Sequence, residues 1–421
     1  MRAVFEGRLK GWKSLDYVAG WFIKAADYGV QTKAAAAFVS TNSICQGEQV
    51  PLLWPLIFET GHEIAFAHTS FKWANLASHN AGVTVAVIGI TRHAGKLHRL
   101  FSIADDGSVL AKDVHNINAY LTAGPNVIVT AVSRPPVNKA PMVWGNKPTD
   151  GGHLVLSCYE REKLESANPK AGKFIRPYRG AAEFIRGLER FCIWVEDVDG
   201  SAASQIKELR ERFDRVRHFR ESSIAAETRP AASYPHRFRQ IQSIAKQHTL
   251  VLPQVSSERR EYFPIGLLSS RTIVSNLAFA LYDAPLWNMA IIASKLHLVW
   301  IGTVCGKLET RYRYSNTLGW NTFPVRTLTE QNKADLTCCA EDILLAREAH
   351  FPATIADLYD PETMPANLRE AHERNDDTLE RIYIGRRFKN DTERLEKLFD
   401  LYTEMTAQQG TARTRKVEVG A

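Results

Sequence analysis

The sequence predicts an α/β segment at the N-terminus, a mixed α+β region in the middle and a helical region at the C-terminus. Three observations lead to this prediction. Between residues 15 and 90, helical patterns alternate with runs of small and β-branched apolar residues that are typical of strands. Residues 153–325 combine short β-rich runs with one basic helical stretch, and the pattern after Thr327 is helical. A chain of 421 residues is long enough for two or three such domains.

The N-terminal segment contains a succession of helices and strands. Between Leu15 and Tyr28, apolar and aromatic residues recur at helical spacing, and the run AAAAFV that follows is typical of a buried strand. The expected elements are a helix over 15–28, a strand over 34–39, a helix over 52–58, a strand over 63–71 and a last strand over 80–90. These strands are too few for a complete doubly wound domain, so the segment resembles half of one.

Repeated Gly, Pro, Asn and Asp residues between about 105 and 150 predict a loop-rich connection. The last residues carry no apolar pattern and are expected to be disordered. The predicted divisions are an α/β segment over 1–110, a connection over 111–150, a mixed domain over 151–326, a helical domain over 327–410 and a tail over 411–421.

Composition limits the class of protein. The formal charge of +7 and the isoelectric point near 9.0 favour a polyanionic partner such as nucleic acid. The six cysteines form no CxxC pair, and the thirteen histidines never reach metal-ligand spacing, so no metal site is expected. No apolar run is long enough to span a bilayer and no signal peptide is evident, which predicts a cytoplasmic protein without a membrane partner.

A polar cluster interrupts the first predicted strand. The run AAAAFV ends abruptly at Thr41-Asn42-Ser43, and Gln46 follows shortly afterwards. In α/β sheets, ligands bind in the crevice outside the carboxyl ends of the strands. The cluster therefore predicts one wall of a ligand-binding crevice.

Several blocks resemble the MmeI-like family, the single-chain type IIL restriction-modification enzymes that contain a gamma-class adenine DNA methyltransferase. The resemblance runs in order along nearly the whole chain. Its blocks are LDYVAGWFIKAADY (15–28), FVSTNSICQGEQV (38–50), FAHTSFKWANLASHNAGVTVAVIGI (66–90), NINAYL (116–121), MVWGNKPTDGGHLVLS (142–157), FIRPYRGAAEFIRGLERFCIWV (174–195), GKLETRYRYSNTLGWNTFPV (306–325) and LYDPETMPANLREAH (358–372).

The resemblance implies the C-terminal part of a Rossmann-like methyltransferase sheet, then a target-recognition domain and a C-terminal helical domain. Family members carry, upstream of these blocks, a glycine-rich turn that binds S-adenosylmethionine and an Asn-Pro-Pro-Phe/Tyr catalytic loop. Neither motif is present in this sequence, and no nuclease signature is evident. The implied cofactor is S-adenosylmethionine, and the implied partners are double-stranded DNA and a separately encoded N-terminal methyltransferase half. Two alternatives stay open: a non-catalytic, sequence-specific DNA-binding module, and the remnant of a decayed gene.

The resemblance assigns candidate catalytic roles to two aromatic residues, and the predicted strand end adds a third candidate, Asn42. An adenine methyltransferase must hold its target base outside the helix against an aromatic face. Phe71 and Trp73 lie in the block that resembles the base-stacking block of the family, with Phe71 the stronger candidate. The alternative is that both rings pack beneath a helix. From their place at the predicted strand end, Asn42 and Gln46 are expected to orient the target DNA or shape the pocket, unless Asn42 or Ser43 caps the helix that begins near Gln49.

The segment 308–314 is the main candidate for base recognition. If it forms one strand, Glu309, Arg311 and Arg313 share one face and three alternating residues share the other. Arginine can bind guanine with two hydrogen bonds, and a carboxylate can accept one from the cytosine amine. The alternative is an exposed ladder of ion pairs, and the family resemblance favours recognition.

Three further cations are candidates for DNA contact. Arg237 and Arg239 alternate with aromatic residues, and Lys147 lies in the glycine-rich string 145–152, which is otherwise only a tight connection. The basic helical stretch 205–220 could contact phosphates, although a solvated helix with internal ion pairs explains it equally well.

Overall fold

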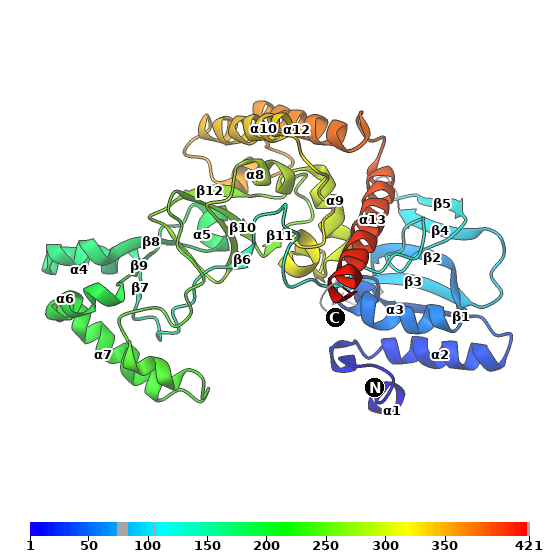
Figure 1. The fold of residues 1–421 in the computed structure, drawn as a ribbon, viewed down its shortest axis with the longest axis horizontal. Coiled ribbons are helices and arrows are strands. Elements are labelled where there is room, and N and C mark those ends of the chain that lie inside the picture. The colour runs from blue at the N-terminus through cyan, green and yellow to red at the C-terminus, as the bar shows by residue number, and fades with distance from the viewer. Residues whose placement is uncertain (74–82, 104–106, 419–421) are drawn as a thin grey trace. The chain divides into compact units, whose positions relative to one another are not determined.

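The structure is a computed structural model that describes residues 1–73, 83–103 and 107–418 (Figure 1). The chain divides into two compact units, and each is built from separate stretches of sequence. The first unit contains residues 1–138, 295–327 and 379–421, and the second contains residues 139–294 and 328–378. None of the helices in the described ranges combines the length and apolar character needed to cross a bilayer.

The first unit begins with a five-stranded mixed sheet. Its elements are α1 (Arg2–Phe5), η1 (Trp12–Ser14), α2 (Ala19–Gln31), β1 (Ala36–Thr41), η2 (Asn42–Cys45), α3 (Gln49–Glu59), β2 (Glu63–Lys72), β3 (Thr84–Thr91), β4 (His98–Ile103) and β5 (Val109–Val114). The strand order is β1-β3-β2-β4-β5. The second strand in this order, β3, is antiparallel to its neighbours β1 and β2, whereas β2 and β4 are parallel.

Two expectations for this sheet were wrong. The run 80–90 was expected to be the last strand, but β4 and β5 follow it and complete the sheet. The strand β5 lies inside the range that was expected to be loop. The described part of the run begins at residue 83, and residues 80–82 lie outside the described residues.

Helices α2 and α3 cover one face of the sheet (Figure 1). The ring of Phe22 in α2 lies 4.5 Å from that of Phe38 in β1. Phe38 is paired with the fully buried Ile88 of β3, so both residues belong to the helix-covered face. Trp54 in α3 is also fully buried and donates from Nε1 to the carbonyl oxygen of Ile44 at 2.8 Å. Aromatic packing between the helices and the sheet therefore forms the core of this part of the unit.

The first unit is completed by segments from the middle and the end of the chain. These are α9 (Lys295–Val304), β15 (Lys307–Leu308), β16 (Arg311–Arg313), the π-helix η6 (Asn316–Trp320) and α13 (Asp391–Glu418). Trp300 in α9 packs between Phe399 and Tyr402 of α13, with ring centroids 5.6 and 5.8 Å apart. Tyr120 stacks on Phe399 at 5.6 Å, and the Thr130 amide donates to the Tyr402 hydroxyl. The helix α13 runs through Glu418, into the range that was expected to be tail, and residues 419–421 lie outside the described residues.

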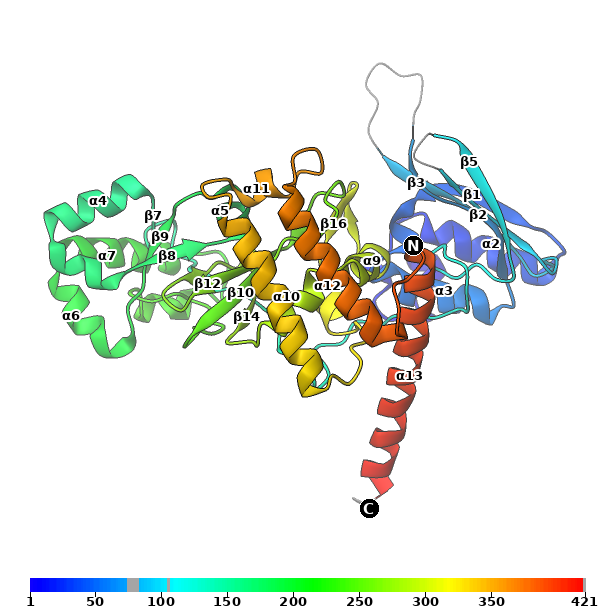
Figure 2. The same cartoon turned by 90° about the horizontal axis from the view of Figure 1, so that it is seen from above.

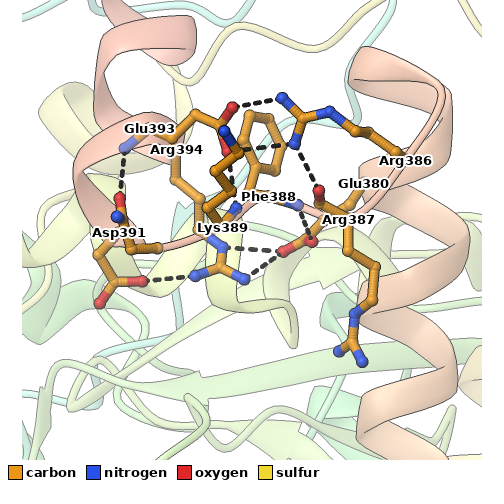
Figure 3. A network of polar contacts seen from close by, with 9 residues as sticks. Glu380, Arg386, Arg387, Phe388, Lys389, Asp391, Glu393 and Arg394 are labelled. Atoms are coloured by element: carbon orange, nitrogen blue, oxygen red, sulfur yellow. Dashed lines mark hydrogen bonds and ion pairs between the residues drawn. The ribbon is translucent and has the colours of Figure 1, made fainter.

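A polar network fixes the turn that precedes α13 (Figure 3). The carboxylate of Glu380, fully buried, accepts from Arg394 Nε at 2.8 Å and from the Phe388 amide at 2.8 Å. On the outer side, Arg386 pairs with Glu393, whose carboxylate also accepts from the Lys389 amide. The turn is therefore held by two carboxylates that each receive a guanidinium and a backbone N–H.

The second unit contains two small four-stranded sheets and a layer of helices. Its elements are β6 (Val143–Trp144), β7 (Val155–Leu156), α4 (Cys158–Ala167), η3 (Pro169–Phe174), β8 (Ile175–Arg179), α5 (Ala181–Arg186), β9 (Phe191–Ile193), η4 (Asp197–Asp199), α6 (Gly200–Gln205), α7 (Lys207–Glu221), η5 (Arg229–Ser233), β10 (His248–Pro253), β11 (Val255–Ser256), β12 (Gly266–Ser269), β13 (Ile273–Val274), β14 (Ala278–Tyr282), α8 (Trp287–Ile292), α10 (Glu330–Glu348), α11 (Ile355–Leu358) and the larger part of α12 (Ala366–Ile384). One sheet has the order β13-β8-β9-β7 and the other β12-β10-β14-β6.

The helical layer of the second unit contains α8, α10 and α12. The helices α10 and α12 lie side by side in both views (Figures 1 and 2) and are joined by the hydrogen bond from Arg374 to Asp342. A buried polar network ties this layer to the neighbouring loops. The Arg347 guanidinium donates from Nε to the Tyr359 hydroxyl at 2.9 Å and from Nη1 to the Ile265 carbonyl at 2.6 Å. The Tyr359 hydroxyl lies 2.7 Å from His372 Nε2, and Tyr262 stacks on the His372 ring. The partial α/β sheet, the mixed α+β region and the helical region confirm the predicted fold class.

Candidate functional site

The polar cluster lies at the carboxyl end of β1, as predicted. Asn42 is the first residue of η2, and it is buried. Its Nδ2 has no hydrogen-bond partner among the described residues. The Ser43 hydroxyl donates to the Asp16 carboxylate and lies 2.9 Å from the Thr41 hydroxyl. The helix α3 begins after Glu48 without a side-chain cap, so the alternative in which Asn42 or Ser43 caps α3 is wrong.

The turn between β1 and α3 does not fit S-adenosylmethionine. Gly47 has a left-handed φ of 57°, and its amide donates to the Val304 carbonyl at 3.2 Å. A Cβ at Gly47 would lie 3.4 Å from the Gly306 amide nitrogen. The glycine therefore allows the turn to pack against the connection that follows α9, and it leaves no glycine-rich cradle of backbone N–H groups for a cofactor. Gln46, at the end of η2, is also buried.

Four rings form a row along β2 and β4. The His68 ring lies 4.6 Å from Phe71 and 6.3 Å from Phe101, and Phe71 lies 6.4 Å from Trp73. His68 and Phe71 are paired with Val87 and Val85 of β3, whereas α2 and α3 cover the face that carries the alternate residues. The alternative in which Phe71 and Trp73 pack beneath a helix is therefore wrong. The Trp73 side chain is 41% exposed, and Phe71 is half-buried.

The segment 308–314 is a hairpin rather than one strand. β15 and β16 pair antiparallel, with Leu308 opposite Arg311, and Glu309-Thr310 forms the turn. Glu309 has a φ of 59°, in the left-handed region, and cannot share a strand face with the two arginines. Arg311 and Arg313 do project from the same side of β16, and both are exposed. The Glu309 carboxylate still reaches Arg311, at 2.9 Å from Nη2.

Two tyrosines anchor this hairpin to α9. A Cβ added at Gly302 would lie 3.1 Å from Cε1 of Tyr312, so the absent side chain leaves room for this ring. The buried Tyr314 hydroxyl lies 2.8 Å from Nε2 of His297 in α9. Burial raises the pKa of the Tyr314 hydroxyl well above its ordinary value. The hairpin therefore presents its arginines outward while its tyrosines fix it to the protein.

Lys147, Arg237 and Arg239 lie close together in the second unit. The Lys147 amide donates to the Gln240 carbonyl at 2.9 Å, and the Arg239 amide donates to the Pro148 carbonyl at 3.1 Å. Lys147 is exposed. The Arg237 guanidinium pairs with Asp197 and stacks on Tyr234, while the Arg239 side chain donates to the Glu227 carbonyl. The three cations thus belong to one local surface, although Arg237 is already engaged by a carboxylate.

Most residues of the string 145–152 have a structural role. A Cβ at Gly145 would lie 2.3 Å from the Ser275 carbonyl oxygen, so only glycine fits. The buried Asn146 side chain donates to the Ser243 carbonyl and accepts from the Gln242 amide at 2.7 Å. The Asp150 carboxylate accepts from the Leu154 amide. Lys147 is the exposed cation of this string and keeps its role as a candidate.

The basic helix α7 is only partly exposed, and its last arginine is fully buried. The Arg220 guanidinium donates to five backbone carbonyls at 2.8–3.0 Å and is unavailable for phosphate contact. These carbonyls belong to Pro148, Thr149, Ala231, Tyr234 and Arg237. Arg220 therefore fixes the loop that carries Lys147 to the segment that carries Arg237. The charge pattern of the sequence contains no signal for this role.

The outer side of α7 lines a shallow hollow that the sequence did not indicate. Its volume is about 500 Å³, and it is lined by His153, Asp214, Arg215, His218, Phe219 and Ser222. Gly151 allows the Phe219 ring to approach the loop, because a Cβ there would lie 2.8 Å from it. In the described ranges, no group of three or more His, Cys, Asp or Glu side chains is arranged to hold a metal ion.

Three family models match consecutive parts of the chain. The DNA-methyltransferase domain of MmeI matches residues 1–102, and the MmeI target recognition domain matches residues 123–327. The MmeI C-terminal domain matches residues 328–409. The chain belongs to the MmeI-like family.

Two relatives within this family show how much of it the chain represents. DNA methyltransferase A of Bacillus subtilis (strain 168) is 38% identical over 406 residues, which are 96% of this chain and 45% of that protein. A solved structure of the type IIL restriction-modification enzyme MmeI in complex with DNA is 36% identical and has a TM-score of 0.86. That match covers 96% of this chain and 54% of the MmeI chain. The chain therefore spans about half the length of the relatives that it matches.

The MmeI-like domain borders differ from the borders of the compact units. Residues 295–327 match the target recognition domain, and residues 379–409 match the C-terminal domain, yet both stretches belong to the first unit. The β15–β16 hairpin is therefore packed with the methyltransferase-like sheet in one unit. Lys147, Arg237 and Arg239 belong to the second unit.

Proposed function

We propose that this chain is the target-recognizing, C-terminal part of an adenine-specific DNA methyltransferase of a restriction-modification system. The observation that carries the proposal is the β15–β16 hairpin, which presents Arg311 and Arg313 outward within a chain that matches MmeI over 96% of its length. The proposed reaction transfers a methyl group from S-adenosylmethionine to an adenine amine. The proposed partners are double-stranded DNA and a polypeptide that carries the glycine-rich turn and the Asn-Pro-Pro loop.

The residues of this chain would act on the DNA. Arg311 donates to the edge of a guanine in the major groove, because its guanidinium fork matches guanine N7 and O6. Arg313 and Glu309 contact neighbouring bases. Phe71 stacks on the adenine that has left the helix, with Trp73 at the rim and Asn42 facing the crevice.

The second unit would contribute contacts that position the DNA. Lys147, Arg237 and Arg239 bind phosphates, which hold the protein in register on the duplex without reading sequence. His236 and Arg237 hold the pKa of the Asp197 carboxyl below its ordinary value, so this group stays ionised. The Asp197 carboxylate would therefore compete with a DNA phosphate for the Arg237 guanidinium. We therefore expect Lys147 and Arg239 to contribute more to phosphate binding than Arg237.

The proposal is tested by complementation. The chain is mixed with the segment of the B. subtilis relative that it does not match, together with labelled S-adenosylmethionine and a mixed-sequence duplex. We expect label in adenine only when both polypeptides are present, and no tight cofactor binding by this chain alone. Strong binding of S-adenosylmethionine to the isolated chain would contradict the proposal, which assigns the cofactor to the second polypeptide.

The alternative function is a sequence-specific DNA-binding module without catalysis. The same hairpin supports it, because base recognition by Arg311 requires no methyl transfer. This alternative predicts sequence-specific binding of a duplex by the isolated chain and no methylation in any mixture. A third possibility, a decayed gene remnant, predicts neither, and its upstream DNA would contain stop codons where the missing motifs belong. A cytoplasmic location stays a prediction.

A further inference from the structure

We infer that one backbone hydrogen bond, from the Gly47 amide to the Val304 carbonyl, couples base reading by the β15–β16 hairpin to the crevice at the end of β1. The bond measures 3.2 Å, and both residues belong to the first unit. The inference rests on the proposed function, because that function gives the hairpin to the DNA bases and the crevice to the target adenine. Gly47 is a positioning residue in this scheme, since it acts through the segments that it joins.

The end of α9 holds both ends of the hairpin. Only Cys305 and Gly306 separate α9 from β15. The Gly306 carbonyl accepts from the Arg313 amide at 3.1 Å, which ties the second strand back to the start of the first. The Cys305 sulfur lies 3.9 Å from the Ser315 carbonyl oxygen, just beyond the hairpin. Arg311 and Arg313 are therefore carried by a short hairpin that cannot move independently of α9.

The same end of α9 is capped from the crevice. The last four carbonyls of a helix have no partner within the helix and need a donor from elsewhere. Val304 is the last residue of α9, and it is fully buried. Its carbonyl therefore depends on the Gly47 amide rather than on bulk water. The partial negative charge at the carbonyl end of a helix also favours this N–H group.

Gly47 ends the segment 42–47, which we call the crevice wall. Two polar side chains of the wall, Asn42 and Gln46, are buried. The Nδ2 atom of Asn42 has no hydrogen-bond partner among the described residues, so it can donate to a bound group. The Gly47 N–H belongs to the peptide unit that begins at Gln46. A movement of the Val304 carbonyl therefore acts directly on the wall.

Two properties of Gly47 suit it to this contact. Its φ of 57° is left-handed, a conformation that glycine adopts at little cost. A Cβ there would lie 3.4 Å from the Gly306 amide nitrogen and 3.5 Å from Gly306 Cα. Both atoms belong to the backbone, which cannot rotate away as a flexible side chain can. A larger residue at position 47 therefore separates the crevice wall from the base of the hairpin.

The coupling makes the correct base pair raise the rate of methyl transfer as well as the affinity. When Arg311 binds its base, the hairpin and the end of α9 take one position, and the Gly47 bond brings the crevice wall into the matching position. Assembly of a site by the correct substrate raises kcat, whereas contacts made with every duplex lower KM alone. A wrong base pair leaves the wall unassembled.

Gly47→Ala tests the coupling in the chain mixed with the unmatched segment of the B. subtilis relative. The substrates are a duplex that this mixture methylates and the same duplex changed at the base pair that Arg311→Ala ceases to discriminate. We expect Gly47→Ala to lower kcat on the first duplex about 10-fold, to leave kcat on the second unchanged and to change KM less than about threefold.

Gly7→Ala is the matched control. Gly7 also has a left-handed φ, of 83°, in the same unit, and a Cβ there meets nothing within 4 Å. It is expected to keep the parent values of kcat on both duplexes. Parent values for Gly47→Ala would overturn the inference. Equal losses of kcat on both duplexes, or a rise in KM alone, would overturn it too, because a merely structural role predicts them.

Hydrogen exchange of the chain alone separates this inference from the proposed function. The probe is a duplex selected from a mixed-sequence pool by binding to the chain, and an unselected duplex of equal length is the comparison. Slower exchange over residues 42–48 with the selected duplex only, lost in Gly47→Ala and kept in Gly7→Ala, supports the coupling. If no mixture then methylates DNA, the proposed function fails and the coupling stands. Equal exchange over 42–48 with both duplexes overturns the coupling, whatever the result for methyl transfer.

Discussion

Arg311 donates from Nη2 to the carboxylate of Glu309 at 2.9 Å, across the turn of the β15–β16 hairpin. Both side chains are exposed, and an exposed ion pair contributes only about 0–1 kcal/mol. The pair can therefore hold the guanidinium in position in the free protein and release it to a base. Removing either partner tests whether the hairpin reads sequence.

Arg311→Ala is expected to cost about 1–3 kcal/mol of discrimination at one base pair of the target. The measurement is competition binding with a set of duplexes, each changed at one position. Lys147→Ala is the contrasting variant, because a phosphate contact weakens binding to all duplexes alike and lowers its salt dependence. If Arg311→Ala lowers the affinity for all duplexes equally, Arg311 also contacts a phosphate rather than a base.

Gly302→Ala is expected to reduce the same discrimination by about 1 kcal/mol, although Gly302 belongs to the helix beneath the hairpin. The added Cβ would lie 3.1 Å from the Tyr312 ring and displace it by a few tenths of an ångström. Gly306→Ala is the control, since a Cβ there meets nothing within 4 Å. The prediction fails if both variants keep the discrimination of the parent protein.

Phe71→Ala is expected to slow methyl transfer by the complemented enzyme about 10–100-fold, because stacking on one base contributes about 1–3 kcal/mol. Binding of the duplex should change much less. Fluorescence of 2-aminopurine at the target position measures whether the base still leaves the helix. Phe101→Ala is the control within the same aromatic row. Normal rates for Phe71→Ala would exclude the stacking role.

Arg220→Met is expected to destabilise the second unit by about 3–5 kcal/mol, because five backbone carbonyls lose the fully buried guanidinium that is their common donor. Hydrogen exchange of the α7 amides in increasing urea reports this local stability. Arg217→Met removes an exposed arginine of the same helix, one that pairs with Asp214, and should cost no more than about 1 kcal/mol. Equal effects of the two substitutions would contradict the structural role given to Arg220.

Acid is expected to loosen the start of α13. The Arg386 guanidinium and the Lys389 amide lower the pKa of Glu393 from 4.5 to about 2. A lowered folded-state pKa means that the stabilisation is complete above the unfolded value and is lost as the pH falls from about 4.5 towards 2. Hydrogen exchange of the first α13 turns should speed up over that range. Glu393→Gln should remove this dependence, whereas Glu396→Gln, at an exposed site of the same helix, should keep it.

Strands were easiest to predict from the sequence where burial of one face gives the apolar residues a regular spacing. The run around Phe38 and the run around Ile88 are apolar because their strands lie beneath helices, and both were predicted as strands. The strand β5 was missed because most of its residues are exposed, so its sequence VLAKDV shows no alternation between a buried and an open side. Its pairing with β4 comes from the rest of the sheet rather than from its own pattern.

The candidate site was predictable to a similar extent. The residue types of Arg311 and Arg313 predict base recognition, and their exposure is compatible with it, but this role stays a prediction. The hairpin was missed because its turn, Glu309-Thr310, lacks the Asn-Gly type of signal that marks such turns. Arg220 could not be found, since a charge in a basic helix gives no indication that distant backbone carbonyls converge on it.

The packing of Trp300 against Phe399 and Tyr402 has a consequence for the time at which the protein can fold. During synthesis the sheet of the first unit leaves the ribosome before α13, the helix that completes its unit. At about 5–20 residues per second, the Trp300 ring waits roughly 5–20 s and the Tyr120 ring roughly 14–56 s for Phe399 of α13. The core of the first unit therefore cannot be complete until α13 has been synthesised.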